Sequence, residues 1–211
     1  MPTILTFGDS NTHGTPPIVT PGVYARFPAG TRWPTVMAAE LGPKWTLVEE
    51  SLPGRTAQFP DPIMGPHMEG TSALRIALES HGPIDVLTIM LGTNDTKNMF
   101  GATPEKIAGG MDALLRIARS EPMQTRHGGF KILLICPPPV KVQGPISDQF
   151  LFADTKGKAL PPLYKTIAAH HGVGYMDAGK VIETSAIDGV HFDEADHPKL
   201  GQAVANAVRA L

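Results

Sequence analysis

The chain has little cysteine and no long apolar run. Its one cysteine, Cys136, excludes an internal disulfide framework and a cysteine-based zinc site. No apolar segment approaches the roughly 18 residues of a membrane-spanning helix. The start of the chain, Met1-Pro2-Thr3, lacks the basic region of a signal peptide. We therefore expect a protein of a reducing compartment, the cytoplasm, without a membrane partner.

A surplus of positive charge is also missing. The chain has 18 Lys and Arg residues against 20 Asp and Glu residues, a formal net charge of −2, so nucleic acid is not an expected partner. Hydrophobic residues make up 42% of the chain and charged residues 18%, which excludes intrinsic disorder. The 22 glycines and 21 prolines are spread along the sequence. This distribution favours shaped loops on a single domain, residues 1–211, over a linker.

Short apolar runs alternate with helical patterns along the chain. The runs are rich in Ile, Leu and Val without clear polar alternation, as in strands that are buried on both faces. They cover Thr3–Phe7, Trp45–Glu50, Ile84–Leu91, Phe130–Cys136 and Val173–Asp177. Helices are predicted at about Arg32–Leu41, Ser72–Ser80, Thr103–Ser120 and Leu163–His171, and from Pro198 to the C-terminus.

This alternation predicts an α/β fold in which a five-stranded parallel sheet lies between two layers of helices. The common doubly wound order for five strands, 2-1-3-4-5, places the carboxyl ends of the first and third strands side by side. Residues that follow Phe7 and Leu91 should therefore share one crevice. Two long loops, 13–30 and 137–162, either line that crevice, form oligomer contacts or are plain surface.

Polar residues with catalytic potential follow three of the predicted strands. Ser10, in the segment 8–11 (GDSN), presents a hydroxyl after the first strand. Asn94, in the segment 92–95 (GTND), offers an amide that can stabilise a developing oxyanion. Gly54, after the second strand, offers a backbone N–H that can do the same. Each segment taken alone also fits an ordinary turn.

A histidine near the end of the chain can supply the base that a serine nucleophile needs. His191 follows Asp188 at a spacing of three residues, so the carboxylate can orient the imidazole and stabilise its protonated form. A second pair, Glu194 and His197, has the same spacing. Because Pro198 follows it, His197 fits better in the approach to the last helix. We therefore assign the base to His191.

Two other interpretations of these residues remain. His191, His197 and nearby aspartates could form the metal site of a metal-dependent hydrolase, although no metal-binding motif of recognised spacing supports it. In the second interpretation, the protein is a non-catalytic binding module built on the same sheet. Loss of activity with a chelator would favour the metal, and a Ser10 that does not react with an organophosphate would favour the binding module.

Taken together and in this order, residues 8–10 (GDS), Gly54, residues 92–95 (GTND) and the pair of Asp188 and His191 resemble the SGNH/GDSL hydrolase family. The stretches 4–10, 90–97 and 188–192 look like the bacterial arylesterase and perhydrolase-like acyltransferase group. The resemblance implies a three-layer α/β/α, flavodoxin-like fold. It also implies that no cofactor and no metal are required, and that the protein is a homo-oligomer.

The resemblance assigns a role to each motif residue. Ser10 is the nucleophile, His191 the general base and Asp188 its orienting acid. The backbone N–H groups of Ser10 and Gly54 and the side chain of Asn94 form the oxyanion hole.

Three residues near the nucleophile, Asp9, Asn11 and His13, are expected to line the substrate pocket. Asn11 stands where the family usually has leucine, and His13 where the acyltransferase relatives are expected to have tryptophan.

The expected activity is hydrolysis of short-chain acyl esters of aryl or alkyl alcohols through an acyl-enzyme on Ser10. Transfer of the acyl group from the same acyl-enzyme to an alcohol or to peroxide is a further expected activity. Carbohydrate O-acetylesterase activity is the alternative within the family.

Overall fold

The computed structural model describes residues 1–211. All strands pair in parallel in one sheet of order β2-β1-β3-β4-β5, which confirms the predicted order. The strands are β1 (Thr3–Gly8), β2 (Thr46–Ser51), β3 (Val86–Met90), β4 (Lys131–Cys136) and β5 (Gly174–Asp177). Gly8 pairs with both Ser51 and Met90, so the carboxyl ends of β1, β2 and β3 lie at the same level. Segments that leave these ends are therefore neighbours.

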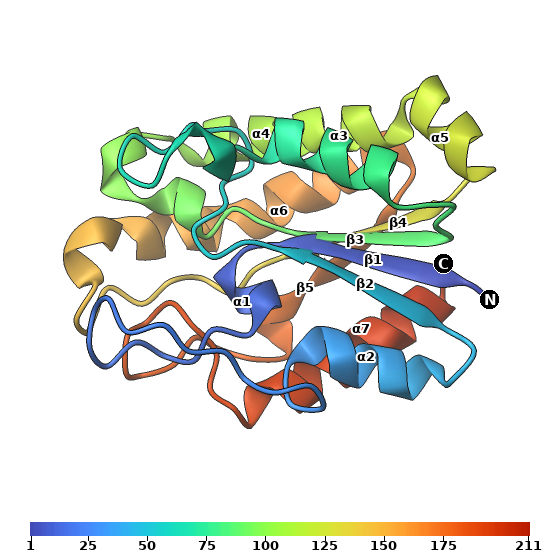
Figure 1. The fold of residues 1–211 in the computed structure, drawn as a ribbon. Coiled ribbons are helices and arrows are strands. Elements are labelled where there is room, and N and C mark those ends of the chain that lie inside the picture. Colours follow the sequence, from blue (N-terminus) through green and yellow to red (C-terminus); the bar gives the residue numbers. More distant parts are fainter.

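Helices cover both faces of the sheet (Figure 1). On one side lie α3 (Gly70–Ser80), α4 (Pro104–Arg119), α5 (Glu121–His127) and α6 (Ala153–His171), and on the other α2 (Trp33–Leu41) and α7 (Asp196–Arg209). Side chains alternate across each strand, so Leu5 and Phe7 join one apolar core while Ile4 joins the other. The central strands β1, β3 and β4 are buried on both faces, as their continuous apolar runs predicted, whereas the edge strands β2 and β5 are only partly buried.

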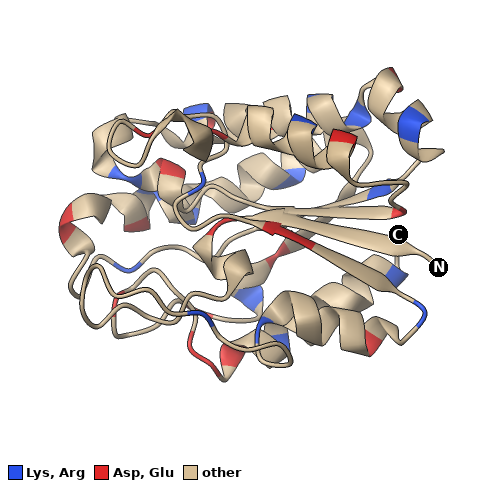
Figure 2. Cartoon of the chain, viewed as in Figure 1, with Lys and Arg blue, Asp and Glu red and all other residues tan.

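Short helical turns occupy the loops at the carboxyl ends of the strands. They are α1 (Ser10–His13) and the 3-10 turns η1 (Pro66–Met68), η2 (Asn94–Thr96), η3 (Asn98–Phe100), η4 (Ser147–Phe150) and η5 (Ala178–Lys180). Long loops gather at this end of the sheet, at the left of Figure 1. Charged residues of both signs are spread over the helices and loops (Figure 2). None of the helices combines the length and the apolar character that crossing a bilayer requires.

The start of α6 corrects the predicted end of the second long loop. The adjacent prolines Pro161 and Pro162 predicted a helix from Leu163, yet α6 begins at Ala153 and contains both. Proline removes a helical N–H, but packing overrides this cost here. Leu160 and Tyr164 of α6 are fully buried, and the Tyr175 hydroxyl donates to the carbonyl of Pro161 at 3.0 Å. The sequence also did not predict α5, and α7 begins two residues before the expected Pro198.

Candidate active site

A sharp turn after β1 holds Ser10. Asp9 caps α1 by accepting the N–H of Asn11 at 3.0 Å, and Ser10 is the first residue of this four-residue helix. Glycine is needed at position 8 because a Cβ there would overlap the Thr12 hydroxyl. Ser10 is buried except for 6% of its surface, and it lines a cavity at the carboxyl end of the sheet.

Ser10, His191 and Asp188 form one hydrogen-bonded chain. The Ser10 Oγ lies 3.1 Å from His191 Nε2, and His191 Nδ1 lies 2.6 Å from Asp188 Oδ2. The carboxylate is fully buried and the imidazole is 5% exposed. These contacts join residues that are 181 positions apart in the sequence. The arrangement suits proton transfer from a hydroxyl to an imidazole that a carboxylate orients.

The His191 side chain and several backbone N–H groups hold the Asp188 carboxylate in its ionised form. Its Oδ1 accepts the N–H groups of Val190 and His191, each at 2.9 Å, and its Oδ2 accepts the Ile18 N–H at 2.6 Å. Burial opposes ionisation, but the hydrogen bond and charge of His191 and these N–H groups outweigh it and lower the pKa of Asp188 to about 2. The group is therefore a carboxylate at neutral pH.

The residues predicted to form the oxyanion hole lie around the same cavity. Gly54 adopts a φ of +93°, and its backbone N–H has no hydrogen-bond acceptor within the protein. The Asn94 Nδ2 donates to the Arg55 carbonyl at 3.1 Å and more weakly to Asp9 Oδ2 at 3.4 Å. Gly54 and Asn94 line the cavity together with Ser10 and His191. The backbone of Gly54 and the amide of Asn94 therefore lie beside the same cavity as the Ser10 hydroxyl.

Two buried carboxyl groups belong to residues that adjoin Ser10 and Asn94 in the sequence. Asp9 is 1% exposed, and burial raises its pKa to about 6. Asp95 is fully buried, and burial raises its pKa to about 7. The Asp95 side chain accepts the Ala57 N–H at 2.9 Å and 3.0 Å, which ties the loop after β2 to the loop after β3. Asp95 thus fixes the relative position of the two loops that carry Gly54 and Asn94.

The three residues expected to line the pocket lie behind it or to one side. Asp9, Asn11 and His13 are not among the residues that line the cavity. Asn11 is 1% exposed and donates through Nδ2 to the Val190 carbonyl at 3.1 Å, so it joins the Ser10 turn to the His191 loop. His13 Nε2 lies 2.9 Å from the Tyr24 hydroxyl.

The cavity beside Ser10 has a volume of about 180 Å³. Its wall combines the site residues with apolar side chains from the two long loops and with polar side chains from η2 to η4. The lining residues are Ser10, Thr15, Ile18, Pro53, Gly54, Met64, Asn94, Lys97, Ile146, Gln149, Phe150, Val190 and His191. The sequence interpretation missed Ile18 as a partner of Asp188, because the long loop carries no motif that marks it.

The groups of the alternative metal site have other partners. His197 is fully buried at the start of α7, where its Nδ1 accepts the Trp33 N–H at 3.2 Å. Asp193 accepts the Ser185 hydroxyl at 2.6 Å, and Asp196 is paired with Lys199 at 2.8 Å. These contacts do not direct the side chains to a common point with His191, whose two ring nitrogens face Asp188 and Ser10.

The fold and this arrangement are those of a serine-type hydrolase on a three-layer α/β/α scaffold. A model of the GDSL-like Lipase/Acylhydrolase family matches residues 6–199, and the chain belongs to this family of carboxylic ester hydrolases. A comparison with curated protein sequences finds no match.

Solved structures similar to this chain include two kinds of esterase. The native aryl esterase of M. smegmatis is 38% identical with a TM-score of 0.94, and the match covers 100% of both chains. A carbohydrate acetylesterase from Sinorhizobium meliloti is 36% identical with a TM-score of 0.94, over 100% of this chain and 99% of that one. A carbohydrate acetylesterase family member from the same organism is 30% identical with a TM-score of 0.90. That match covers 100% of this chain and 98% of that one.

Proposed function

We propose that the chain hydrolyses short-chain acyl esters of aryl or alkyl alcohols through an acyl-enzyme on Ser10. The observation that carries this proposal is the hydrogen-bonded chain from Ser10 through His191 to a fully buried Asp188. A serine hydroxyl is a weak nucleophile until a base removes its proton, and His191 Nε2 lies 3.1 Å from it. The carboxylate of Asp188 stabilises the imidazolium that then forms.

The first half of the reaction forms the acyl-enzyme. Ser10 Oγ attacks the acyl carbonyl while His191 takes the serine proton, and the carbonyl oxygen becomes an oxyanion. The N–H groups of Ser10 and Gly54 and the Asn94 amide donate to it, and each such donor contributes roughly 3–4 kcal/mol to transition-state stabilisation. His191 then gives its proton to the departing alcohol. The second half repeats these steps with water, or with an alcohol or peroxide as the acyl acceptor.

The dimensions of the cavity support a short acyl group. A cavity of about 180 Å³ beside Ser10 is lined in part by Ile146, Phe150 and Val190, which are buried. Apolar walls of this kind favour an alkyl group over a charged one.

Deacetylation of a carbohydrate is the second candidate activity. The similarity to a carbohydrate acetylesterase from S. meliloti over the whole of this chain favours it. The proposed chemistry at Ser10 is the same in both cases, and the two candidates differ only in the alcohol that leaves.

A panel of nitrophenyl esters of increasing acyl length, with an acetylated sugar alongside, tests the proposal. We expect kcat/KM to be highest for the shortest acyl groups. An organophosphate ester should label Ser10 covalently and abolish activity, and a chelator should leave activity unchanged. Activity that survives complete labelling of Ser10, or labelling at another residue, would contradict the proposal.

We also propose that the chain is a single domain, that it acts in the cytoplasm and that it forms a homo-oligomer. One buried cysteine, Cys136, is consistent with a reducing compartment. Exposed apolar side chains on the long loops support association with further copies. They are Val19, Val23, Tyr24, Leu151 and Phe152. Molecular mass in solution tests the oligomeric state.

A further inference from the structure

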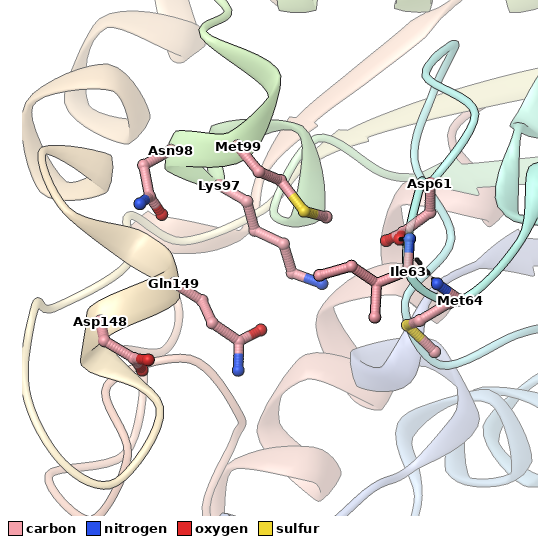
Figure 3. Close-up of a pocket in the computed structure, with 8 residues that line it drawn as sticks. All are labelled: Asp61, Ile63, Met64, Lys97, Asn98, Met99, Asp148 and Gln149. Carbon is pink, nitrogen blue, oxygen red and sulfur yellow. Dashed lines mark hydrogen bonds between the residues drawn. The ribbon is translucent and has the colours of Figure 1, made fainter.

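A second cavity of about 250 Å³ adjoins the cavity beside Ser10. It lies between the loop 61–64 and the turns η3 and η4, and Figure 3 shows its lining residues. Three side chains line both cavities: Met64, Lys97 and Gln149. The two spaces are therefore neighbouring compartments that only side chains separate. A substrate whose acyl group occupies the first can extend its alcohol part into the second.

Lys97 is the unusual group of this shared wall. Only 6% of the surface of Lys97 is exposed. The ammonium lies 5.8 Å from the centroid of the Phe150 ring, and no hydrogen bond or ion pair joins it to another residue. Burial lowers the pKa of Lys97, which reflects the cost of keeping this charge away from water. An ammonium that lines a cavity without a protein partner can donate to a ligand oxygen that enters this cavity.

Hydrogen-bond acceptors face the same space. Figure 3 shows Lys97 extending toward the loop of Asp61, with the Gln149 side chain pointing into the space from the other side. Asp61 is 2% exposed, and its Oδ1 accepts the N–H groups of Ile63 and Met64, each at 2.8 Å. Its Oδ2 is buried and has no hydrogen-bond partner. The Gln149 amide can both donate and accept.

We propose that this second cavity is a subsite for the alcohol part of the ester, and that it selects neutral alcohols that carry further hydroxyl groups. The Lys97 ammonium donates to one hydroxyl oxygen of the alcohol, and Gln149 binds another. This assignment rests on the proposed esterase function, and of the two candidate leaving groups it favours a carbohydrate over an aryl or simple alkyl alcohol.

The charge of the lining favours a neutral polyhydroxy alcohol over an anion. An anion is bound best by donors without nearby carboxylates, whereas here Asp61 and Asp148 also line the cavity. A hydroxyl group donates and accepts, so it can bond to a lysine, an amide and a carboxylate in one small space. An apolar alcohol would leave the Lys97 ammonium without a partner.

Glycerol monoacetate and propyl acetate test the subsite because they share a carbon skeleton and differ by two hydroxyl groups. The ratio of their kcat/KM values measures selection for hydroxyls, and it does not depend on the fraction of folded enzyme. We expect Lys97→Met to lower this ratio by about tenfold or more, since a hydrogen bond to a charged group is lost. Gln149→Leu, at an exposed position, should lower it by a smaller factor in the same direction.

Lys44→Met is the matched control, because Lys44 is exposed in the turn before β2, at the opposite end of the sheet. It removes the same charge and should leave the ratio unchanged. An unchanged ratio in both the Lys97 and Gln149 variants, whether or not the two kcat/KM values fall together, would overturn the proposal. A loss confined to an anionic ester, acetylated lactate, would also overturn it. If the parent protein hydrolysed neither ester, the esterase function itself would fail, and if Ser10→Ala still hydrolysed both, the acyl-enzyme on Ser10 would fail.

Discussion

Two buried histidines, six positions apart, lie in opposite environments. His191 has a carboxylate at Nδ1 and a serine hydroxyl at Nε2, and it faces a cavity. His197 packs against the rings of Phe27 and Phe192, at centroid distances of 5.2 Å and 5.8 Å. Its Nδ1 accepts a backbone N–H, and its Nε2 has no partner. Burial lowers the pKa of His197 to about 4.

The difference shows what turns an imidazole into a base. His191 can accept a proton because Asp188 compensates the positive charge that results. His197 has no buried carboxylate at either nitrogen, so protonation there would place an uncompensated charge between aromatic rings. The same spacing of acid and histidine in the sequence thus leads to a hydrogen-bonded chain with Ser10 in one case and to core packing in the other.

Replacement of the two histidines should differ most in its effect on kcat. We expect His191→Gln to lower kcat by a factor on the order of 10⁶, as loss of the base does in other serine hydrolases. His197→Asn should change kcat less than about tenfold, because Asn can still accept the Trp33 N–H and His197 touches no reacting atom. Steady-state hydrolysis of a nitrophenyl acetate measures both. Equal losses in the two variants would remove the distinction.

Replacement of the carboxylate tests why His191 differs. Asp188→Asn keeps the size of the side chain but can no longer compensate the charge of the imidazolium. We expect kcat to fall by a factor on the order of 10⁴. A circular dichroism spectrum like that of the parent protein is the control for folding. A variant that kept more than about a tenth of the parent kcat would show that Asp188 does not support the base.

The oxyanion donor is expected to have a smaller effect. Asn94→Ala removes one donor that acts mainly in the transition state, so kcat should fall by about 10²–10³ while KM changes little. Kinetics over a range of substrate concentrations separates the two constants. An increase in KM alone would assign Asn94 to substrate binding instead.

The smallest expected effect is on stability, and it comes from His197. Its pKa is about 4 in the folded protein and about 6.5 in the unfolded chain, so the unfolded chain binds more protons between these values. The contribution of His197 to stability is therefore complete above pH 6.5 and is lost as the pH falls toward 4, by roughly 3 kcal/mol at most.

Denaturant unfolding of the parent protein and of His197→Asn at several pH values measures this contribution as a difference. The parent should lose stability relative to the variant as the pH falls through this range. Parallel curves would mean that His197 does not titrate between the two values.

The sequence predicted the strand order, and with it which segments meet at the carboxyl ends of the strands. Ser10 and Asn94 follow neighbouring strands of a parallel sheet, so their proximity follows from the order alone. The acid and histidine spacing did not distinguish His191 from His197, and only Pro198 favoured the correct assignment of His197 to the last helix. The reason for the difference between them, a buried carboxylate against an aromatic cage, depends on tertiary packing.

Contacts made by long loops could not be predicted. The Ile18 N–H reaches Asp188 from a loop whose sequence has no periodicity, and its path is set by packing rather than by local preference. The start of α6 was missed for a similar reason, because the burial of Leu160 and Tyr164 outweighs the local cost of two prolines. Likewise, no sequence pattern indicates that Lys97 and Asp61 line one cavity.

The central claim is that Ser10 and His191 act as one unit, and a double-mutant comparison tests it most directly. We predict that Ser10→Ala and His191→Gln lower kcat by similar factors, and that the double variant is no slower than either single variant. Two losses that multiply in the double variant would contradict the account, because they would mean that the hydroxyl and the imidazole contribute independently.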